Sequence, residues 1–92
     1  MIKSFKHKGL EKFFTTGDTA GIQAAHATTI RDRLAFLHAA MTIEDMDIPG
    51  YRLHELKGKL KDHWAIDVSK NWRIVFRFED GDAYVVNYED YH

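Results

Sequence analysis

Three side chains in the second half of the chain have the chemistry to act on a phosphate group. Arg73 and Arg77 each carry a planar guanidinium, whose fork of N–H donors matches two phosphate oxygens. His92, the last residue, carries an imidazole that gains and loses a proton near neutral pH, as a general base must. Ordinary surface arginines and a frayed polar chain end are the alternative interpretations. Whether these residues act on a phosphate or are ordinary surface groups depends on where the fold places the three side chains.

The charged residues are distributed unevenly, although the formal net charge is only −1. Residues 1–50 hold six basic and six acidic side chains, residues 51–78 hold seven and three, and residues 79–92 hold five acidic ones and no Lys or Arg. A surplus of four positive charges in the middle block attracts phosphate, because charges within about 10 Å interact strongly at ordinary salt. A solvated strand face is the alternative.

The first half of the chain predicts two helices. The first is short and ends at Gly17, and its apolar side is formed by Leu10, Phe13 and Phe14. The main helix lies within residues 22–41, where apolar side chains recur at steps of four, three and four: Ile30, Leu34, Leu37 and Met41. One more turn is expected within residues 42–47, before Pro49 and Gly50 redirect the chain.

From Tyr51 onward the apolar period becomes two, which predicts strands with one buried face. The residues on the buried side are Tyr51, Leu53, Trp64, Ile66, Val68, Trp72, Ile74, Phe76 and Phe78. Asp80 and Gly81 predict a two-residue hairpin turn, because such turns need positive φ, which glycine adopts at little cost. Lys70 and Asn71 are expected to form the preceding turn. Ile2 and Phe5 are expected to open the chain as a short strand.

These elements predict a single α+β domain over residues 1–92, with two N-terminal helices packed on one face of a three- to four-strand antiparallel sheet. Side chains alternate between the faces of a strand, so a buried Trp72 places Arg73 and Arg77 on the opposite face, which is free for a ligand. Trp64 and Trp72 are expected to belong to the core rather than to stack on bases.

Composition excludes several classes of site. The absence of cysteine excludes disulfides, thiolate zinc sites and a cysteine nucleophile. The six histidines form no zinc motif, and no glycine-rich phosphate loop occurs, so neither a metal nor a cofactor is expected. No run of about 18 apolar residues and no signal peptide is present, which predicts a cytoplasmic protein without a membrane partner.

Several motifs resemble the HigB toxins of bacterial type II toxin–antitoxin systems. They are LHELKG at residues 53–58, NWR at 71–73 and YEDYH at 88–92, and the opening MIKSFKHKGL is similar too. The resemblance covers essentially the whole chain. It implies membership of the RelE/ParE superfamily, whose RelE-like microbial ribonuclease fold agrees with the elements above.

The resemblance also implies an activity and partners. Such toxins are ribosome-dependent mRNA endonucleases, or mRNA interferases, which cut translated message in the ribosomal A site by metal-independent attack of the 2′-hydroxyl and so inhibit translation. The implied partners are the ribosome with its A-site message and a HigA-type helix-turn-helix antitoxin, through which alone the toxin would contact operator DNA.

By matching positions, the resemblance implies six catalytic residues: His54, Lys57, Arg73, Asp90, Tyr91 and His92. RNA cleavage needs a base for the 2′-hydroxyl proton, stabilisation of charge on the phosphate, and an acid for the leaving 5′-oxygen. His92 is expected to be the base and Arg73 to bind the phosphate.

Each of the other four has an alternative role. Lys57 is expected to reach a phosphate, or else is an ordinary turn lysine. His54 is a candidate general acid or a structural, hydrogen-bonded histidine, and which histidine is acid and which is base stays open. Tyr91 would stack on a base or cover the sheet edge. Asp90 would orient His92 or anchor the turn.

Contact with RNA and the ribosome is expected from local basic patches, since the isoelectric point is near 6.6. The residues expected to supply it are Lys3, Lys6, Lys8, Arg52, Lys59, Lys61 and Arg77. Two other functions fit the same scaffold. One is a ParE-like inhibitor that binds DNA gyrase without ribonuclease chemistry, and the other is an inactive protein that only binds its antitoxin. The six matching residues argue against the last.

Overall fold

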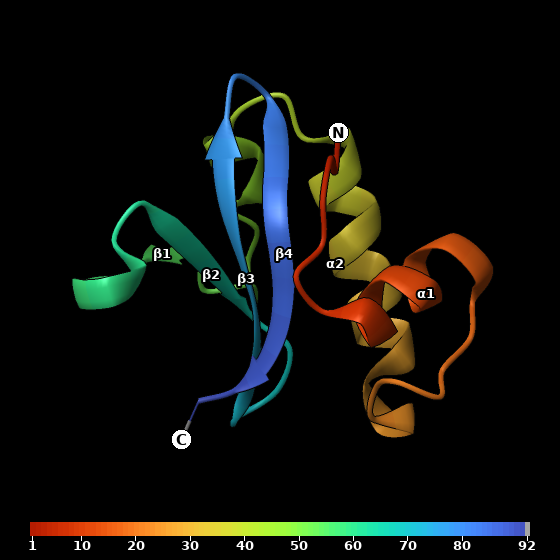
Figure 1. Cartoon of the computed structure of the whole chain (residues 1–92). Helices are drawn as coiled ribbons and strands as arrows, with labels where there is room; N and C mark the ends of the chain where they lie inside the picture. The colour runs from red at the N-terminus through yellow and green to blue at the C-terminus, as the bar shows by residue number, and fades with distance from the viewer. Residues whose placement is uncertain (92) are drawn as a thin grey trace.

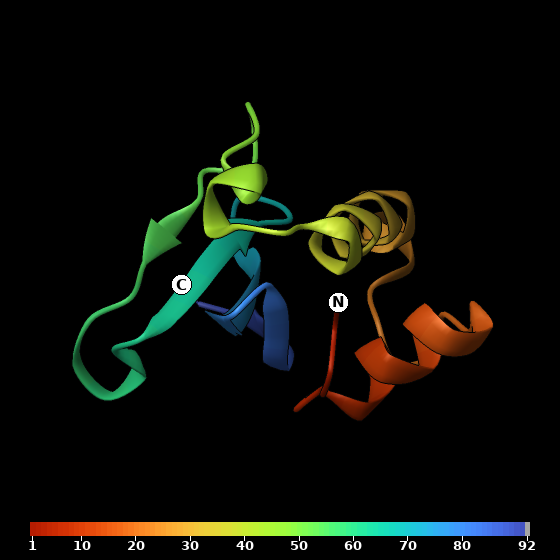
Figure 2. The ribbon, with the colours of Figure 1, turned by 90° about the horizontal axis from the view of Figure 1, so that it is seen from above.

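The structure is a computed structural model that describes residues 1–91. Its helices and strands are α1 (Lys8–Thr16), α2 (Ala27–Ala39), β1 (His54–Glu55), β2 (His63–Asp67), β3 (Trp72–Glu79) and β4 (Asp82–Asp90). Three short 3₁₀ turns complete it: η1 (Ala24–His26), η2 (Ile43–Met46) and η3 (Gly58–Leu60). Both helices lie on one side of the sheet, and the β1–η3 segment projects away from them (Figures 1 and 2). The predicted α+β fold is confirmed.

Helix α1 has the predicted position and a defined cap at each end. The Nδ1 atom of His7 accepts the backbone N–H of Leu10 at 2.9 Å, which satisfies a donor that the first turn leaves free. Gly17 ends the helix with a φ of 82° and donates its N–H to the carbonyl of Phe13. Leu10 and Phe13 are buried, as the periodicity predicted.

The main helix is shorter than the hydrophobic pattern predicted. Its residues Ile30, Leu34 and Leu37 are buried, but α2 ends at Ala39 and the side chain of Met41 is 77% exposed. The prediction that Met41 continues the buried stripe is therefore wrong. The cause is local, because the carboxylate of Asp45 accepts the N–H groups of Met41 and Thr42 at 2.9 and 3.2 Å and starts η2 there.

The sheet is an antiparallel meander in the order β1-β2-β3-β4. Asp80 and Gly81 join β3 to β4 with φ values of 51° and 82°, as predicted for the hairpin. The predicted N-terminal strand is reduced to two isolated parallel bridges, of Ile2 with Ala83 and of Phe5 with Val86. The N-terminal segment therefore lines the free edge of β4 without becoming a regular strand.

A β-bulge divides β4 into two parts. The pairing with β3 shifts by one residue between Val75 and Arg77, and Val85 at the bulge has a φ of 48°. The hydroxyl oxygen of Ser4 accepts the N–H of Val85 at 2.8 Å. The bulge thus fixes which side chains of the second half of β4 point to each face of the sheet.

The predicted strand from Tyr51 is also shorter than expected. Tyr51 is buried and Leu53 is half-buried, so the alternation of the pattern holds. Arg52, however, has a φ of 54°, a left-handed conformation that breaks a strand, and β1 contains only His54 and Glu55.

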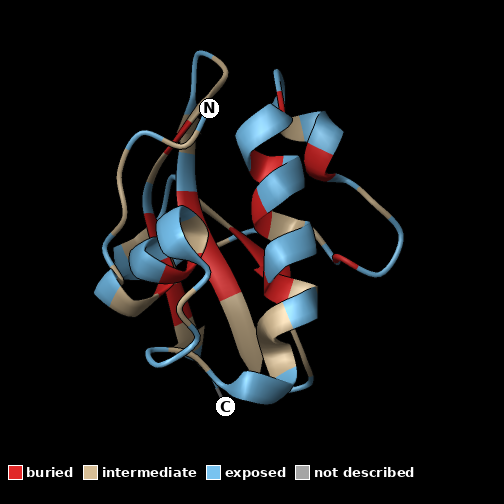
Figure 3. Cartoon of the chain, turned by 90° about the vertical axis from the view of Figure 1, so that its right-hand side faces the viewer, coloured by how far each residue is buried: buried red, intermediate tan, exposed pale blue. Residues whose placement is uncertain are grey.

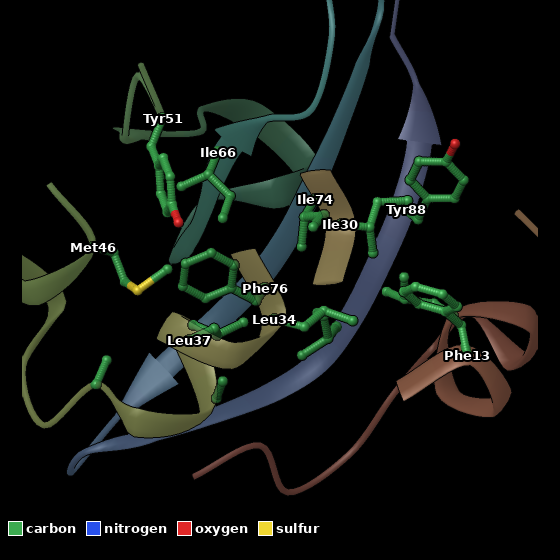
Figure 4. Packing of buried hydrophobic residues seen from close by; sticks show 14 residues of the cluster. Phe13, Ile30, Leu34, Leu37, Met46, Tyr51, Ile66, Ile74, Phe76 and Tyr88 are labelled. Carbon is green, nitrogen blue, oxygen red and sulfur yellow. The ribbon is translucent and has the colours of Figure 1, made fainter. Parts of the chain in front are cut away.

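The core lies between the helices and the sheet. In Figure 3 the buried residues of α2 form patches on the side turned to the strands. Leu34 and Leu37 pack there with Ile74 and Phe76 of β3 (Figure 4), and each fully buried side chain of this size contributes about 1.5–3 kcal/mol. The two tryptophans are half-buried against this core, as predicted. Among the described residues no helix is long and apolar enough to cross a membrane.

Candidate active site

The face of the sheet that points away from the helices carries three of the predicted site residues, His54, Arg73 and Arg77. Residues paired in register on neighbouring strands share a face, and three such rows cross this open face. The rows are Asp67–Arg73–Glu89, then His54–Ala65–Val75–Asn87, then His63–Arg77–Tyr84. The prediction that Arg73 and Arg77 share the open face is confirmed.

Arg73 is the most enclosed cation of this face. Its side chain is 15% exposed, and its Nη2 atom donates to Oε2 of Glu89 at 3.3 Å. The guanidinium carbon lies 4.5 Å from the ring centroid of Tyr91, a cation–π contact. The Nε atom is buried and has no hydrogen-bond partner among residues 1–91. Within the described residues one donor of the guanidinium is therefore unsatisfied, which is unusual for a buried polar group.

The end of the chain lies beside Arg73 as far as it is described. Tyr91 donates its backbone N–H to the carbonyl of Asn71 at 2.9 Å, which keeps the two strand ends together. Asp90 pairs with Trp72, so its side chain leaves β4 toward the helix side rather than toward Arg73. His92, the predicted base, lies outside the described residues.

His54 and Lys57 come from the projecting β1–η3 segment. The Nδ1 atom of His54 lies 2.8 Å from the carbonyl oxygen of Arg52. A carbonyl only accepts, so Nδ1 carries the hydrogen and Nε2 is the nitrogen left to exchange protons. His54 and Arg73 lie two strands apart in the sheet and two residues apart along the strand direction. Their Cα atoms are therefore roughly 12 Å apart. Lys57 is exposed just after β1.

Five of the predicted RNA-binding residues form two groups at opposite edges of the sheet, and Arg52 and Arg77 belong to neither group. Lys59 and Lys61 are exposed on the segment between β1 and β2, as is the predicted catalytic residue Lys57, and none of the three forms an ion pair within the described part of the chain. The second group is equally exposed, with Lys3 and Lys6 beside β4 and Lys8 at the start of α1.

Acidic side chains neutralise part of the open face, which the sequence did not predict. The Nε atom of Arg52 lies 3.5 Å from Oδ2 of Asp67, and the Nη2 atom of Arg77 lies 3.8 Å from Oε2 of Glu79. Glu89 contacts Arg73 in the same way. The acidic residues between 79 and 90 thus lie beside the basic block rather than apart from it, because β4 folds back along β3.

The end of β4 is anchored on the helix side by Tyr88. Its ring stacks on Trp72 at 4.5 Å between centroids, and its hydroxyl lies 2.6 Å from Nδ1 of His26. The backbone N–H of Gln23 donates to the same hydroxyl at 3.4 Å, so this one oxygen links the end of β4 to the segment before α2. Burial raises the pKa of Tyr88 above its ordinary value. This anchor fixes the end of β4, so that Glu89 lies opposite Arg73.

The arrangement suits the binding of an anion at Arg73, and His54 is the predicted proton-transferring residue on the same face. Among residues 1–91 no group of three or more His, Asp or Glu side chains is placed to share a metal ion. The residues around Arg73 that sequence reasoning missed are Asp67, Asn87 and Glu89. A regular hairpin from Glu79 and Asp82 would place Tyr88 opposite Arg73. The bulge shifts the register by one residue, so Glu89 lies opposite Arg73 instead.

Comparison with known proteins identifies the family. Residues 3–92 match the HigB-like toxin family, described as RelE-like toxins of the type II toxin–antitoxin system HigB. The chain is 50% identical to Endoribonuclease HigB of Proteus vulgaris over 92 residues, the full length of both chains. It is 34% identical to Toxin HigB-1 of Vibrio cholerae serotype O1 over 85 residues, 90% of each chain.

A solved structure shares the fold at lower sequence similarity. The crystal structure of a copper-bound mutant toxin from Helicobacter pylori superimposes with a TM-score of 0.63 and 18% identity, covering 98% of this chain and 94% of that one. Toxins of type II systems act with an antitoxin, so the family implies an antitoxin partner. The chain belongs to the HigB-like family of RelE-like toxins of type II toxin–antitoxin systems.

Proposed function

We propose that the protein is an endoribonuclease that cuts translated mRNA in the ribosomal A site without a metal ion. The observation that carries the proposal is the enclosed Arg73 on the open face, with Tyr91 stacked against it and one donor that has no partner in residues 1–91. An arginine held this way is ready for an anion with several oxygens. The full-length similarity to a protein named Endoribonuclease HigB supports RNA as the source of that anion.

The proposed reaction uses the 2′-hydroxyl of the RNA as its nucleophile. A base takes the hydroxyl proton, the 2′-oxygen bonds to the adjacent phosphorus, and the bond from phosphorus to the 5′-oxygen breaks. An acid gives a proton to the leaving 5′-oxygen. The products are a 2′,3′-cyclic phosphate and a 5′-hydroxyl, and the phosphate carries extra negative charge in between.

The described residues supply several of these functions. Arg73 would bind the phosphate, and Lys57 would add a second positive charge from the β1–η3 segment. His54 exchanges protons through Nε2, since Nδ1 is held by the carbonyl of Arg52, and would be the acid. Tyr91 would stack on an unpaired base. His92 is proposed as the base from the sequence resemblance alone, and Asp90 as a residue that orients it.

The basic groups at the two sheet edges would bind ribosomal RNA on either side of the open face. They consist of Lys59 and Lys61 at one edge and Lys3, Lys6 and Lys8 at the other, with Arg52 and Arg77 nearer the centre. The protein would act in the cytoplasm, where message is translated. A HigA-type helix-turn-helix antitoxin is the proposed partner, and operator DNA would be reached only through it.

The test is cleavage of a defined message with and without ribosomes. We expect cutting only when the message occupies the A site, with a 2′,3′-cyclic phosphate at the new 3′ end. Arg73→Ala and His92→Ala should abolish it. Arg31→Ala is the matched control, because Arg31 is an exposed arginine on α2, on the other side of the sheet.

Three results would contradict the proposal. Full activity on naked RNA would exclude ribosome dependence. Equal cutting by the Arg73→Ala and Arg31→Ala variants would exclude the open face as the site. DNA breaks without message cleavage in arrested cells would favour the gyrase-inhibitor alternative.

A further inference from the structure

Glu89 forms an ion pair with Arg73, and none of the functions above uses it. Its Oε2 atom accepts the Nη2–H of Arg73 at 3.3 Å, and the two side chains are only 29% and 15% exposed. On the same sheet, the pair of Arg77 and Glu79 is 3.8 Å apart with side chains 50% and 63% exposed. The Arg73–Glu89 pair is therefore the shorter and more enclosed of the two.

The other acid in the row does not hold Arg73. Asp67 pairs with Arg73 in register, but the cation within reach of its carboxylate is Arg52, whose Nε lies 3.5 Å away. The Nε edge of Arg73 has no partner in the described chain. Among residues 1–91 the guanidinium is thus held by two polar contacts, with the oxygen of Glu89 and with the ring of Tyr91.

We propose that Glu89 is a positioning residue that holds the guanidinium of Arg73 over Tyr91, in the orientation that receives the scissile phosphate. The proposal rests on the proposed ribonuclease function. Long side chains lose rotamer freedom when they are held, so an arginine fixed before binding loses less on meeting the phosphate. Misplacement of a catalytic group by about 1 Å can cost a factor of about 100 in rate.

The carboxylate of Glu89 has a second, opposite effect. Its negative charge lies beside the group that must attract a phosphate, so it weakens phosphate binding while it orients the arginine. Glutamine separates the two effects, because its amide oxygen still accepts a hydrogen bond but carries no net charge. Alanine removes both.

The kinetic test compares these variants on ribosomes programmed with one message. Glu89→Ala should lower kcat by about 10- to 100-fold. Glu89→Gln should keep kcat within about threefold of the unchanged protein and lower KM, because the repulsion is gone. Glu79→Ala is the matched control, since it removes the same charge from the exposed pair, and it should leave kcat within about twofold.

A second readout follows Arg73 directly and needs no activity. The protein has five arginines, and the Nε–H nitrogen signal of Arg73 can be assigned by its loss in Arg73→Lys. Because this Nε is buried, its hydrogen should exchange slowly with water. Exchange should become at least about tenfold faster in Glu89→Ala and stay slow in Glu89→Gln and Glu79→Ala.

The two readouts distinguish the possible failures. If the unchanged protein cuts no RNA, the proposed function fails, and the Arg73 signal still decides whether Glu89 holds the guanidinium. If Glu89→Ala leaves both kcat and Nε–H exchange unchanged, the positioning role is overturned. If Glu89→Gln loses as much kcat as Glu89→Ala, the hydrogen-bonding oxygen is not what orients Arg73, and the proposal is equally overturned.

Discussion

Replacing Arg73 with methionine should separate stability from activity. Methionine is unbranched, fills a similar space along the stem and brings no charge or donor. The change removes the contacts of the guanidinium with Glu89 and Tyr91, and it also removes the buried Nε–H that has no partner in residues 1–91. These effects on folding have opposite signs.

Their magnitudes nearly cancel. The ion pair with Glu89, whose side chain is 29% exposed, contributes about 0.2–1 kcal/mol. The cation–π contact with the partly exposed Tyr91 contributes about 0.5–1 kcal/mol. An unsatisfied buried donor costs about 1–3 kcal/mol. The free energy of unfolding of Arg73→Met should therefore lie within about 1 kcal/mol of that of the unchanged protein.

Activity should change far more. Loss of one preorganised donor to the transition state costs about 100- to 1,000-fold in kcat, or about 3–4 kcal/mol. Urea unfolding would measure the stability and cleavage on programmed ribosomes the activity. A loss of more than about 3 kcal/mol in stability would show that Arg73 holds the fold together. Cutting within about tenfold of the unchanged protein would show that it does not bind the phosphate.

Three further predictions concern the scaffold. Gly21→Ala should lower the free energy of unfolding by about 1–3 kcal/mol in urea, because the new Cβ would lie 2.4 Å from the Cα of Gly9; unchanged stability would contradict this close packing. Burial and the hydrogen bond to Asp32 raise the pKa of Tyr51, so its contribution to stability is complete below about pH 10 and is lost as the pH rises through the folded-state value. Tyr51→Phe should reduce the loss of stability at alkaline pH, measured as the unfolding midpoint at a series of pH values. An equally steep loss in this variant would show that Tyr51 does not cause it. Val85→Gly should leave stability within about 1 kcal/mol, because relief of the positive φ offsets the flexibility of glycine; a loss of more than about 2 kcal/mol would show that the valine side chain itself matters.

The regular elements could be predicted because their signals are local. The spacing of Ile30, Leu34 and Leu37 determines the buried side of α2, and Asp80 with Gly81 determines the hairpin. Element ends depended on contacts that periodicity does not contain. The end of α2 depends on the carboxylate of Asp45, four residues beyond Met41.

The candidate site could be predicted only in part. Alternation along β3 places Arg73 on the open face without further information. Its partner could not be predicted, because register counted from the hairpin gives Tyr88 and the bulge at Val85 moves the pairing to Glu89. A valine at positive φ is rare, so nothing in the residue type signals a bulge there.

The most direct test of the ribonuclease account is to map the 5′ ends of cellular transcripts after brief expression of the protein. The account predicts new 5′ ends inside translated reading frames, at a fixed position relative to the codon in the A site, and none in untranslated RNA. Cells that express Arg73→Met should show none of these ends. Cuts spread equally over translated and untranslated RNA, or an unchanged pattern with Arg73→Met, would contradict the account.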